Sequence, residues 1–325
     1  MNTLWKQHHF KHPRLPIEGV IVHQGNLQRP GLGGVRLCYE PFTEYHAKLC
    51  VELAKIMQRK HDHYQLPFSG AKAIICVSNQ QISRQILFEY FASQINQLNS
   101  CYITAVDMNV SQSDLDIVAK TTPFVTNHTA VGGDPSSQTA LGILNAIETV
   151  MAFLPQSSHI RIAIQGIGKV GRALVAHLQA KSIILILNDV DPAALDIYKS
   201  FPNITVSQQD SWLNMPSDIF VPCAGSHVIT PKMCERFNTK FIICGANAPF
   251  TDEITCNEIL TQRGIVVVPD YLTNAGGVML CAAQYYNTDP TISYQKIIET
   301  TRVFLSRHYE NTIREKDSRL HKNSQ

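Results

Sequence analysis

The sequence lacks any uninterrupted apolar stretch of membrane-spanning length, and it lacks long runs of charge of either sign. Its 28 lysines and arginines nearly balance its 26 aspartates and glutamates, which leaves a formal net charge of +2. A chain without a basic run has no electrostatic footprint for nucleic acid or for an anionic membrane surface. We therefore expect neither nucleic acid nor a membrane as a partner.

The sequence also lacks a C-x-x-C pair, although it contains nine cysteines. Most of them lie in apolar, strand-like segments and their number is odd, which is typical of reduced core cysteines. The first residues carry lysine and histidine without the apolar core of a secretory leader, so we expect a cytoplasmic protein. His61 and His63 have no convincing third ligand, so we predict no metal site and place them in solvent or at a pocket edge.

The 325 residues, 44% hydrophobic and 17% charged, are enough for two globular domains. Up to about residue 130, short β-rich runs alternate with helical patterns, of which 44–59 and 83–98 are the longest. From 160 to 269 the pattern becomes strand, helix and strand repeated, which favours a doubly wound parallel sheet. The expected fold class is α/β, with a separate α/β domain in front of a Rossmann domain.

A glycine-rich motif opens the second region. An apolar strand pattern runs into Gly166, Gly168 and Gly171, and a helical pattern follows. In a dinucleotide site the first glycine permits a tight turn, the second lets the pyrophosphate approach the backbone, and the third lets helix and strand pack closely. The helix N-terminus, which contains Lys169 and Val170, would then meet the phosphates.

Asp189 stands at the end of the next apolar run, roughly 20 residues after the glycines, where the motif needs an acidic residue. A carboxylate there accepts hydrogen bonds from the adenosine ribose 2′-hydroxyl and repels a 2′-phosphate. The sequence therefore predicts NAD rather than NADP as the cofactor. The alternative, in which the glycines serve only a strand-to-helix turn, is disfavoured by the full context of strand, helix and carboxylate.

Five separated segments carry a further pattern: 32–36 (LGGVR), 57–60 (MQRK), 69–72 (SGAK), 104–107 (TAVD) and 269–277 (PDYLTNAGG). Together and in this order they resemble the glutamate/leucine/phenylalanine/valine dehydrogenase family, over about residues 18–290. The resemblance implies that Gly34 and Lys60 bind the substrate, with Lys60 on its α-carboxylate. It also implies that Lys72 activates water against an iminium carbon and that Asp107 exchanges protons with the substrate amine. A compact ammonium suits one carboxylate, and burial favours the neutral, basic form of an amine.

Each of these residues has a structural alternative. Lys60 would be a solvated surface lysine, and Asp107 would cap a turn, with Asp114 and Asp116 as nearby competitors for its role. We expect Lys72 in a small-residue loop just before an apolar strand. The segment around Lys72 carries fewer glycines than the family pattern, and the three residues after Asp107 differ from that pattern.

Leu32, Val278 and Cys281 are the candidates for the substrate side-chain pocket. In the glutamate enzymes of the family a lysine stands at the position of Leu32 and holds the substrate's side-chain carboxylate, so the resemblance argues against an acidic substrate. Val278 and Cys281 lie on one face of an expected helix. Together the three would form an apolar wall that suits an aliphatic or aromatic side chain. Ordinary core packing explains each of them alone equally well.

Other candidates follow the strands of the second region. Ala224 and Asn247 come after expected strands, at the edge where ligands bind in open α/β sheets. Asn247 and Asn274 are candidates for hydrogen bonds to the nicotinamide or the substrate, and by resemblance Thr139 lies near the carboxamide. A turn or a helix cap is the alternative role for the asparagines.

The resemblance implies a division of labour between the domains. We expect residues 1–134 to form the substrate-binding, catalytic and dimerisation domain and residues 135–287 to form the NAD-binding Rossmann domain, with a cleft between them. A helix over 288–325 is expected to pack back on the first domain. We expect a homo-oligomer, with a dimer favoured.

The resulting hypothesis is an NAD-dependent oxidoreductase that reversibly deaminates an apolar, branched-chain or aromatic, L-amino acid to the 2-oxo acid and ammonia. Two alternatives stay open. One is a two-domain NAD dehydrogenase without amine chemistry. The other is an NAD-binding sensor or a catalytically altered paralogue. We consider it because the residues around Lys72 and Asp107 differ from the family pattern.

Overall fold

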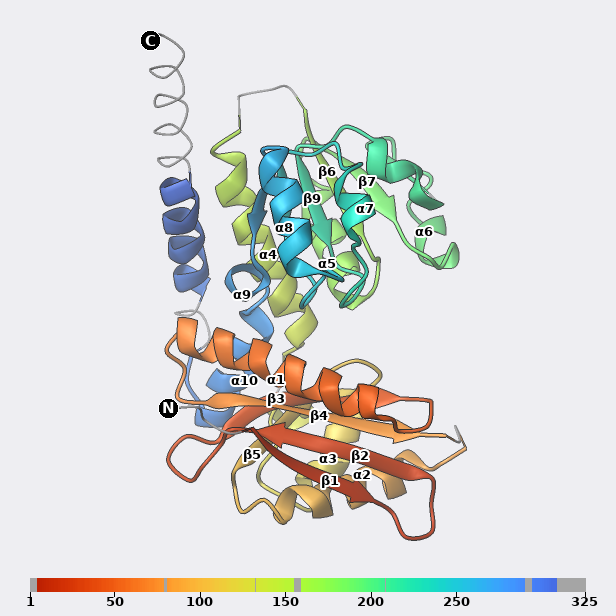
Figure 1. Cartoon of the computed structure of the whole chain (residues 1–325), viewed down its shortest axis with the longest axis vertical. Helices are drawn as coiled ribbons and strands as arrows, with labels where there is room; N and C mark the ends of the chain where they lie inside the picture. The colour runs from red at the N-terminus through yellow and green to blue at the C-terminus, as the bar shows by residue number, and fades with distance from the viewer. Residues whose placement is uncertain are drawn as a thin grey trace. The chain divides into compact units, whose positions relative to one another are not determined.

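The computed structural model describes residues 5–78, 81–131, 133–154, 159–207, 209–289 and 294–308. The chain divides into two units, each with its own sheet: unit 1 is Met1–Pro135 with Gly277–Pro290, and unit 2 is Ser136–Gly276 with Thr291–Gln325 (Figure 1). Among the described residues, no helix combines the length and the apolar character that a membrane crossing requires.

Unit 1 is built on a mixed sheet in the order β1-β2-β4-β3-β5. Its strands are β1 (Lys6–Lys11), β2 (Ile17–His23), β3 (Gly31–Cys38), β4 (Ser69–Val77) and β5 (Tyr102–Val106). β3 runs parallel to both β4 and β5, whereas β2 is antiparallel to β4. β4 is central, and all nine of its residues are buried. A strand covered on both faces reads as a continuous buried run, as this one does.

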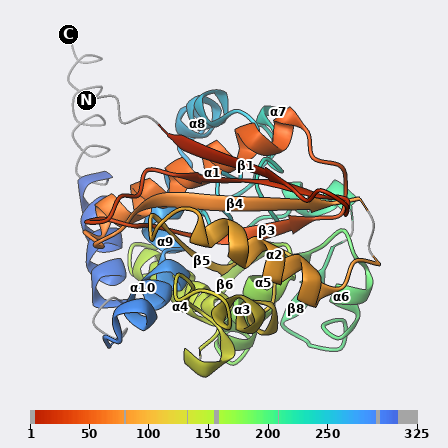
Figure 2. The same ribbon diagram turned by 90° about the horizontal axis from the view of Figure 1, so that it is seen from below.

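The helices of unit 1 are α1 (Glu44–His63), α2 (Arg84–Asn96), α3 (Gln112–Ala119), α10 (Gly276–Tyr286) and the short η1 (Thr129–Val131). The odd-numbered residues of β4 from Ala71 to Val77 pack with α2 and α3 in one apolar cluster. Because side chains alternate along a strand, Lys72 and Cys76 lie on the other face. That face is covered by α1, whose Cys50 thiol donates to the Lys72 carbonyl at 3.3 Å. Figure 2 shows α1 and α2 on opposite sides of β4.

Unit 2 is built on a sheet in the order β11-β10-β9-β6-β7-β8, in which every neighbouring pair is parallel. Its strands are β6 (Ile160–Gln165), β7 (Ile183–Asn188), β8 (Ile204–Val206), β9 (Ile219–Pro222), β10 (Phe241–Ile243) and β11 (Val266–Val268). The chain moves outward from β6 in one direction through β7 and β8, and then in the other through β9, β10 and β11. This is the strand order of a Rossmann fold, with its switch point between β6 and β9. The predicted doubly wound sheet is confirmed.

The helices of unit 2 cover both faces of this sheet. They are α4 (Pro135–Met151), α5 (Lys169–Leu178), α6 (Ala193–Asp196), η2 (Gln209–Asn214), α7 (Pro231–Cys234), α8 (Glu253–Gln262), α9 (Asp270–Thr273) and the helical residues 294–308. Ile219 and Val221 of β9 pack in the cluster that contains α4 and α5, whereas Phe220 packs in the cluster that contains α7 and α8. Alternate strand residues therefore fill two separate cores.

The two segments after residue 276 lie in the units opposite to those expected. α10 belongs to unit 1, where the Thr126 hydroxyl donates to the Cys281 carbonyl at 3.2 Å and the Phe68 ring contacts Tyr285. Residues 294–308 belong to unit 2, because Leu305 is buried in the same apolar cluster as Ile143 of α4. The expected return of a C-terminal helix to the first domain is therefore wrong for 294–308. The rest of that expected helix, 309–325, lies outside the described residues.

Candidate active site

Lys72 and Asp107 form an ion pair inside unit 1, with 2.9 Å between Lys72 Nζ and Asp107 Oδ2. The Lys72 side chain is only 4% exposed, and that of Asp107 is 23% exposed. Arg36 completes the group, because its Nε donates to the same carboxylate oxygen at 3.1 Å. One carboxylate is thus shared by two cations.

The strand register explains why these three side chains meet. Arg36 of β3 pairs with Ile74 of β4, so it lies on the same sheet face as Lys72 two residues earlier. Gly34 pairs with Ala105 of β5, and Asp107 follows two residues later on that face. This is the face that α1 covers. A β-carbon on Gly34 would lie 2.5 Å from the Val106 carbonyl oxygen and 3.0 Å from Asp107 Cβ, so the close approach requires glycine here.

Lys72 lies within β4 rather than in the loop that the sequence suggested. β4 begins at Ser69, and its small residues up to Ala73 are buried strand positions. Serine, glycine and alanine are typical of turns when read alone, but between two neighbouring strands they leave room for close backbone packing. A strand position fixes the direction of the lysine side chain more firmly than a loop does.

The carboxylate of Asp107 is held in its ionised form. Burial raises its pKa, but the nearby charges of Lys72 and Arg36 and their hydrogen bonds lower it more, so the pKa falls well below its usual range. The two competing aspartates have other partners. Asp114 caps α3 and pairs with Arg84, and Asp116 accepts hydrogen bonds from Thr129. Asp107 is therefore the carboxylate that lies beside Lys72.

Lys60 lies in the last turn of α1 and is only 4% exposed, which does not fit the surface alternative. The end of α1 is tied to the start of β4, because the Gln58 side-chain oxygen accepts from the Gly70 N–H at 2.5 Å. The Gln58 amide nitrogen donates to Asp62 at 2.8 Å, and Arg29 donates to the same carboxylate at 2.7 Å. These bonds fix the end of the helix that carries Lys60.

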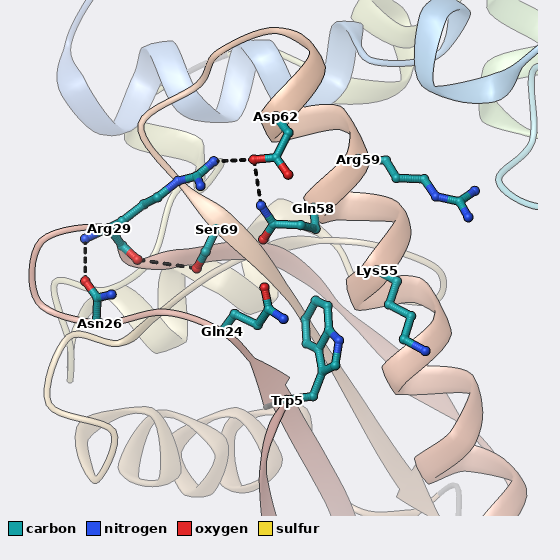
Figure 3. Close-up of a pocket in the computed structure, with 9 residues that line it drawn as sticks. All are labelled: Trp5, Gln24, Asn26, Arg29, Lys55, Gln58, Arg59, Asp62 and Ser69. Atoms are coloured by element: carbon teal, nitrogen blue, oxygen red, sulfur yellow. Dashed lines mark hydrogen bonds and ion pairs between the residues drawn. The ribbon is translucent and has the colours of Figure 1, made fainter. Parts of the chain in front are cut away.

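A hollow of about 570 Å³ lies against this network (Figure 3). It is lined by Trp5, Gln24, Asn26, Arg29, Lys55, Gln58, Arg59, Asp62 and Ser69. Figure 3 shows Arg29, Gln58 and Asp62 joined by hydrogen bonds across it. Lys60, Lys72 and Asp107 do not line this hollow, so it is distinct from the site that the sequence predicted.

His61 is fully buried, which corrects the expectation of a solvated or pocket-edge residue. Its Nε2 donates to the Leu32 carbonyl at 2.9 Å and links α1 to β3. Burial lowers the pKa of His61 to about 4, so the ring stays neutral at physiological pH. His63 is exposed and stacks edge-on against Tyr64.

The three candidates for an apolar pocket are all buried in unit 1, with Leu32 at 1%, Val278 at 9% and Cys281 at 5% exposure. Burial raises the pKa of the Cys281 thiol to about 12, and the charge of Lys72 acts against that shift. Burial fits both a pocket wall and ordinary core packing.

The glycines of unit 2 have the three properties that the motif requires. Gly166 has φ +93°, and a β-carbon on it would meet Ala224 Cα at 2.4 Å. A β-carbon on Gly171 would meet the Gly166 carbonyl oxygen at 2.1 Å, so the helix packs tightly on the turn. Gly168 has no atom within 4 Å of such a β-carbon and stands at the N-cap of α5. Open space beside a helix N-terminus fits a pyrophosphate.

Asp189 follows β7 and faces the same turn. One of its carboxylate oxygens accepts from the Ile167 N–H at 2.6 Å, and the other accepts from the Asp191 N–H at 2.9 Å. Lys169 begins α5 and is exposed, with Val170 next to it. The helix start and the acidic residue are therefore together at the carboxyl edge of the sheet, and these residues fit a dinucleotide.

The other candidates of unit 2 come after its strands or lie on α4. Asn274 is buried and donates to the Gly245 carbonyl at 3.0 Å and to Asn247 Oδ1 at 3.1 Å. Its own side-chain oxygen is buried without a hydrogen-bond partner, so an acceptor is available there. Ala224 is exposed after β9, and Thr139 is half-buried on α4.

Sequence reasoning gave no role to two residues that the structure brings into these groups. Arg36 was visible in the LGGVR segment, and its pairing with Asp107 follows once β3 and β5 are known to be neighbours. Gln165 ends β6 directly before Gly166, and its side-chain oxygen is buried without a partner. No signal in the sequence separates this glutamine from an ordinary strand end.

Comparison with known proteins gives matches over both units. Residues 12–124 match the family model described as the Glu/Leu/Phe/Val dehydrogenase dimerisation domain, and residues 183–316 match that of Glutamate/Leucine/Phenylalanine/Valine dehydrogenase. An L-tryptophan dehydrogenase of Nostoc punctiforme is 28% identical over 83% of this chain and 77% of its own length. A leucine dehydrogenase of Bacillus cereus is 28% identical over 82% of this chain and 74% of its own. The crystal structure of the Nostoc punctiforme L-tryptophan dehydrogenase matches the fold with a TM-score of 0.74 at 23% identity, covering 94% of this chain and 90% of that one.

Proposed function

This chain belongs to the glutamate/leucine/phenylalanine/valine dehydrogenase family and is an amino-acid dehydrogenase, and we propose that it uses NAD to deaminate an apolar L-amino acid reversibly. The reaction converts the amino acid, NAD⁺ and water into a 2-oxo acid, ammonium and NADH with release of one proton. The observation that carries the proposal is the buried Lys72–Asp107 pair at 2.9 Å. Two neighbouring titratable groups whose surroundings shift their pKa values apart are typical of sites for acid–base catalysis.

Lys60 is the residue that would hold the substrate α-carboxylate. It is buried at the end of a helix, and an ammonium in a poorly solvated place is strongly favoured by an anionic partner. The bond from the Gly70 N–H to Gln58 ties that end of α1 to β4, and the bond from Gln58 to Asp62 holds the Gln58 side chain in place. Lys60 would therefore hold the substrate α-carboxylate at a fixed position relative to Lys72 of β4.

Asp107 and Lys72 would move the protons. Lys72 and Arg36 lower the pKa of Asp107 and keep it ionised, and the departure of Lys72 would raise its proton affinity so that it accepts a proton from the substrate ammonium. When the substrate ammonium replaces Lys72 beside the carboxylate, Lys72 would lose its proton to solvent, and its neutral amine would take a proton from the water that attacks the iminium carbon. The protonated lysine would return that proton to the departing amine, and the proton held by Asp107 would then pass to Lys72 and restore the charged pair. Arg36 stays beside Asp107 and keeps its carboxylate in place.

The turn from Gly166 to Gly171 would hold the dinucleotide, and Asp189 would bind its adenosine ribose. When bound, NAD⁺ supplies the acceptor for the hydride that leaves the substrate Cα. Hydrogen bonds from two backbone N–H groups fix the Asp189 carboxylate next to the turn. A fixed anion there favours the 2′-hydroxyl of NAD over the 2′-phosphate of NADP.

The substrate is proposed to have a branched-chain or aromatic side chain. Leu32 is an apolar residue at the place where an acidic substrate would need a cation, and Val278 and Cys281 are buried in the same unit. Relatives of similar identity are named for tryptophan, phenylalanine and leucine. Asn247, Asn274 and Thr139 would orient the nicotinamide or the substrate through hydrogen bonds.

The decisive experiment follows NADH formation with a panel of L-amino acids at alkaline pH, and NADH oxidation with the matching 2-oxo acids with and without ammonium. We expect turnover with apolar amino acids, strict ammonium dependence in the reverse direction and a rate loss of about 10²–10⁴-fold for Lys72→Ala. Lys60→Ala should raise KM, whereas Lys55→Ala, on the exposed face of the same helix, should change neither constant. NADH binding without turnover of any amino acid, or a preference for glutamate, would overturn the proposal.

We further propose that the chain forms a homo-oligomer, at least a dimer, in the cytoplasm. The matched model over residues 12–124 is described as a dimerisation domain. All nine thiols are without disulfides, which fits a reducing compartment. Light scattering of the purified chain tests the first statement, and a monomer at micromolar concentration would contradict it.

A further inference from the structure

A cluster of metal-ligating side chains lies at the ends of β3 and β4. Cys38 is the last residue of β3, and it pairs directly with Cys76 of the parallel strand β4. His46, in the first turn of α1, completes the group. One ligand atom from each of the three residues lies within 4.8 Å of the other two.

The cluster is separate from the catalytic pair. Lys72 and Cys76 are on the same face of β4, and at 3.3 Å per residue they are about 13 Å apart along the strand. Cys76 and His46 are buried at 2% and 3% exposure, while Cys38 is half-buried and leaves a path to solvent. A reachable but largely enclosed group of soft ligands is what a bound metal ion needs.

The donor set fits zinc. Two thiolates and one imidazole are typical zinc ligands, and tetrahedral bonds of about 2.3 Å place sulfur ligands about 3.8 Å apart. The observed limit of 4.8 Å between the ligand atoms needs only a small contraction. The fourth position has a candidate in Glu40, whose Oε1 lies 3.0 Å from His46 Nε2. Its side chain is 61% exposed and is able to move toward an ion.

The hydrogen bonds of His46 fix the orientation of its ring and place the ring proton on Nε2. Nδ1 accepts from the Thr43 N–H at 3.1 Å and lies 3.0 Å from the Thr43 hydroxyl, so the helix cap occupies that nitrogen. Nε2 points to Glu40. When an ion binds Nε2, the ring proton moves to Nδ1, the hydrogen bond from the Thr43 N–H is lost, and the Thr43 hydroxyl accepts the ring proton instead. Histidine ligands of metal ions regularly donate their other ring proton to an acceptor of this kind. The stacked ring of Phe42 holds the imidazole in orientation.

We infer that unit 1 binds a zinc ion through Cys38, Cys76 and His46, with Glu40 as the fourth ligand. Binding forms two zinc–sulfur bonds, one zinc–nitrogen bond and one zinc–oxygen bond, and it releases the two thiol protons to solvent. This departs from the sequence-based expectation of no metal site. The ion would join the start of α1 to the ends of β3 and β4, the elements that carry Lys60, Arg36 and Lys72. Its role is therefore structural.

The experiment uses the full chain, reduced and stripped of metal, and titrates it with cobalt(II) chloride as a spectroscopic substitute for zinc. We expect one equivalent to produce the thiolate-to-cobalt charge-transfer band and the visible bands of a tetrahedral site. Zinc chloride should remove these bands and raise the melting temperature. Cys38→Ser and His46→Gln should lose the charge-transfer intensity in part or whole and should weaken zinc binding by at least about 100-fold.

Cys101→Ser is the matched control, because Cys101 is another half-buried thiol of unit 1 that lies outside the cluster. It should keep both the cobalt spectrum and the zinc-induced rise in melting temperature. Should Cys76→Ser fail to fold, Cys38→Ser at the strand end decides the question. A wild-type chain without a thiolate band, the same band in Cys38→Ser, or a Cys38–Cys76 disulfide in the reduced preparation would each overturn the inference. None of these readouts depends on catalysis.

Discussion

Changing Asp107 should destabilise unit 1 more than changing Lys72, because two cations share one carboxylate oxygen. Lys72 Nζ lies 2.9 Å and Arg36 Nε 3.1 Å from Asp107 Oδ2. Asp107→Asn leaves both cations beside a neutral amide. Lys72→Met leaves the pair of Arg36 and Asp107 in place. The asymmetry follows from the third residue and would not exist for an isolated ion pair.

The magnitudes follow from the burial of the pair. Removing one partner of a buried ion pair costs about 3–5 kcal/mol, since the other charge stays uncompensated. We expect about 3–5 kcal/mol for Asp107→Asn and about half of that for Lys72→Met. In the double variant the lysine charge left behind by Asp107→Asn is also gone. The double change should therefore cost about 1–3 kcal/mol less than the sum of the two single changes.

The two tryptophans make the measurement specific to unit 1. Trp5 belongs to unit 1 and Trp212 to unit 2, so Trp5 fluorescence in a Trp212→Phe background follows unfolding of unit 1 in urea. This matters because a two-unit chain need not unfold in one step. If Lys72→Met costs as much as Asp107→Asn, or if the two changes add within about 0.5 kcal/mol, the shared-carboxylate reasoning is refuted.

Three further predictions concern the other described groups. Gly166→Ala should lower stability by about 1–3 kcal/mol because of its φ of +93°, whereas Gly168→Ala should leave the melting temperature unchanged and weaken NADH binding in fluorescence titrations. Asp189→Ser should raise the ratio of kcat/KM for NADP to that for NAD by at least about tenfold, and Asp191→Ser should not. Burial lowers the pKa of His61 to about 4 in the folded chain. Between pH 6.5 and 4 the ring is therefore protonated in the unfolded chain but not in the folded chain, so the free energy of unfolding should fall by about 3 kcal/mol over this range. His61→Gln keeps a donor for the Leu32 carbonyl and should flatten that part of the melting-temperature profile; an unchanged slope would contradict the assignment.

The sequence predicted those strands whose burial makes a strong pattern. The strand expected before Gly166 is confirmed as β6, Ile160–Gln165, because its apolar run ends at a glycine turn. β1 was missed because five of its six residues are polar or charged and only Phe10 is buried. β8 was missed because a three-residue edge strand has too few positions to show a pattern. Edge strands pair on one side only, so they need less apolar surface.

The candidate site was predictable in its residue types and less so in its surroundings. Lys60, Lys72 and Asp107 could be chosen from sequence motifs, and the structure places Lys72 against Asp107. The burial of His61 could not be predicted, because it depends on the Leu32 carbonyl of another strand. The cluster of Cys38 with Cys76 was equally hidden, since its members meet only through the parallel register of β3 and β4. Contacts across strands require the register, which local patterns do not contain.

Arg36 explains how a site of this kind tolerates the departure of its own lysine. Without substrate, Lys72 neutralises the Asp107 carboxylate. Under the proposed function, an amino acid would bring its own ammonium, which would exchange for Lys72 beside the carboxylate, so the charge balance of the buried group would be preserved during binding. A 2-oxo acid brings no cation, and in the reverse reaction the carboxylate would depend on Arg36 alone until ammonium arrives. Under the proposed function, the second cation on Asp107 would therefore serve both directions of the reaction, because it would keep the carboxylate ionised and in place whether or not Lys72 is beside it.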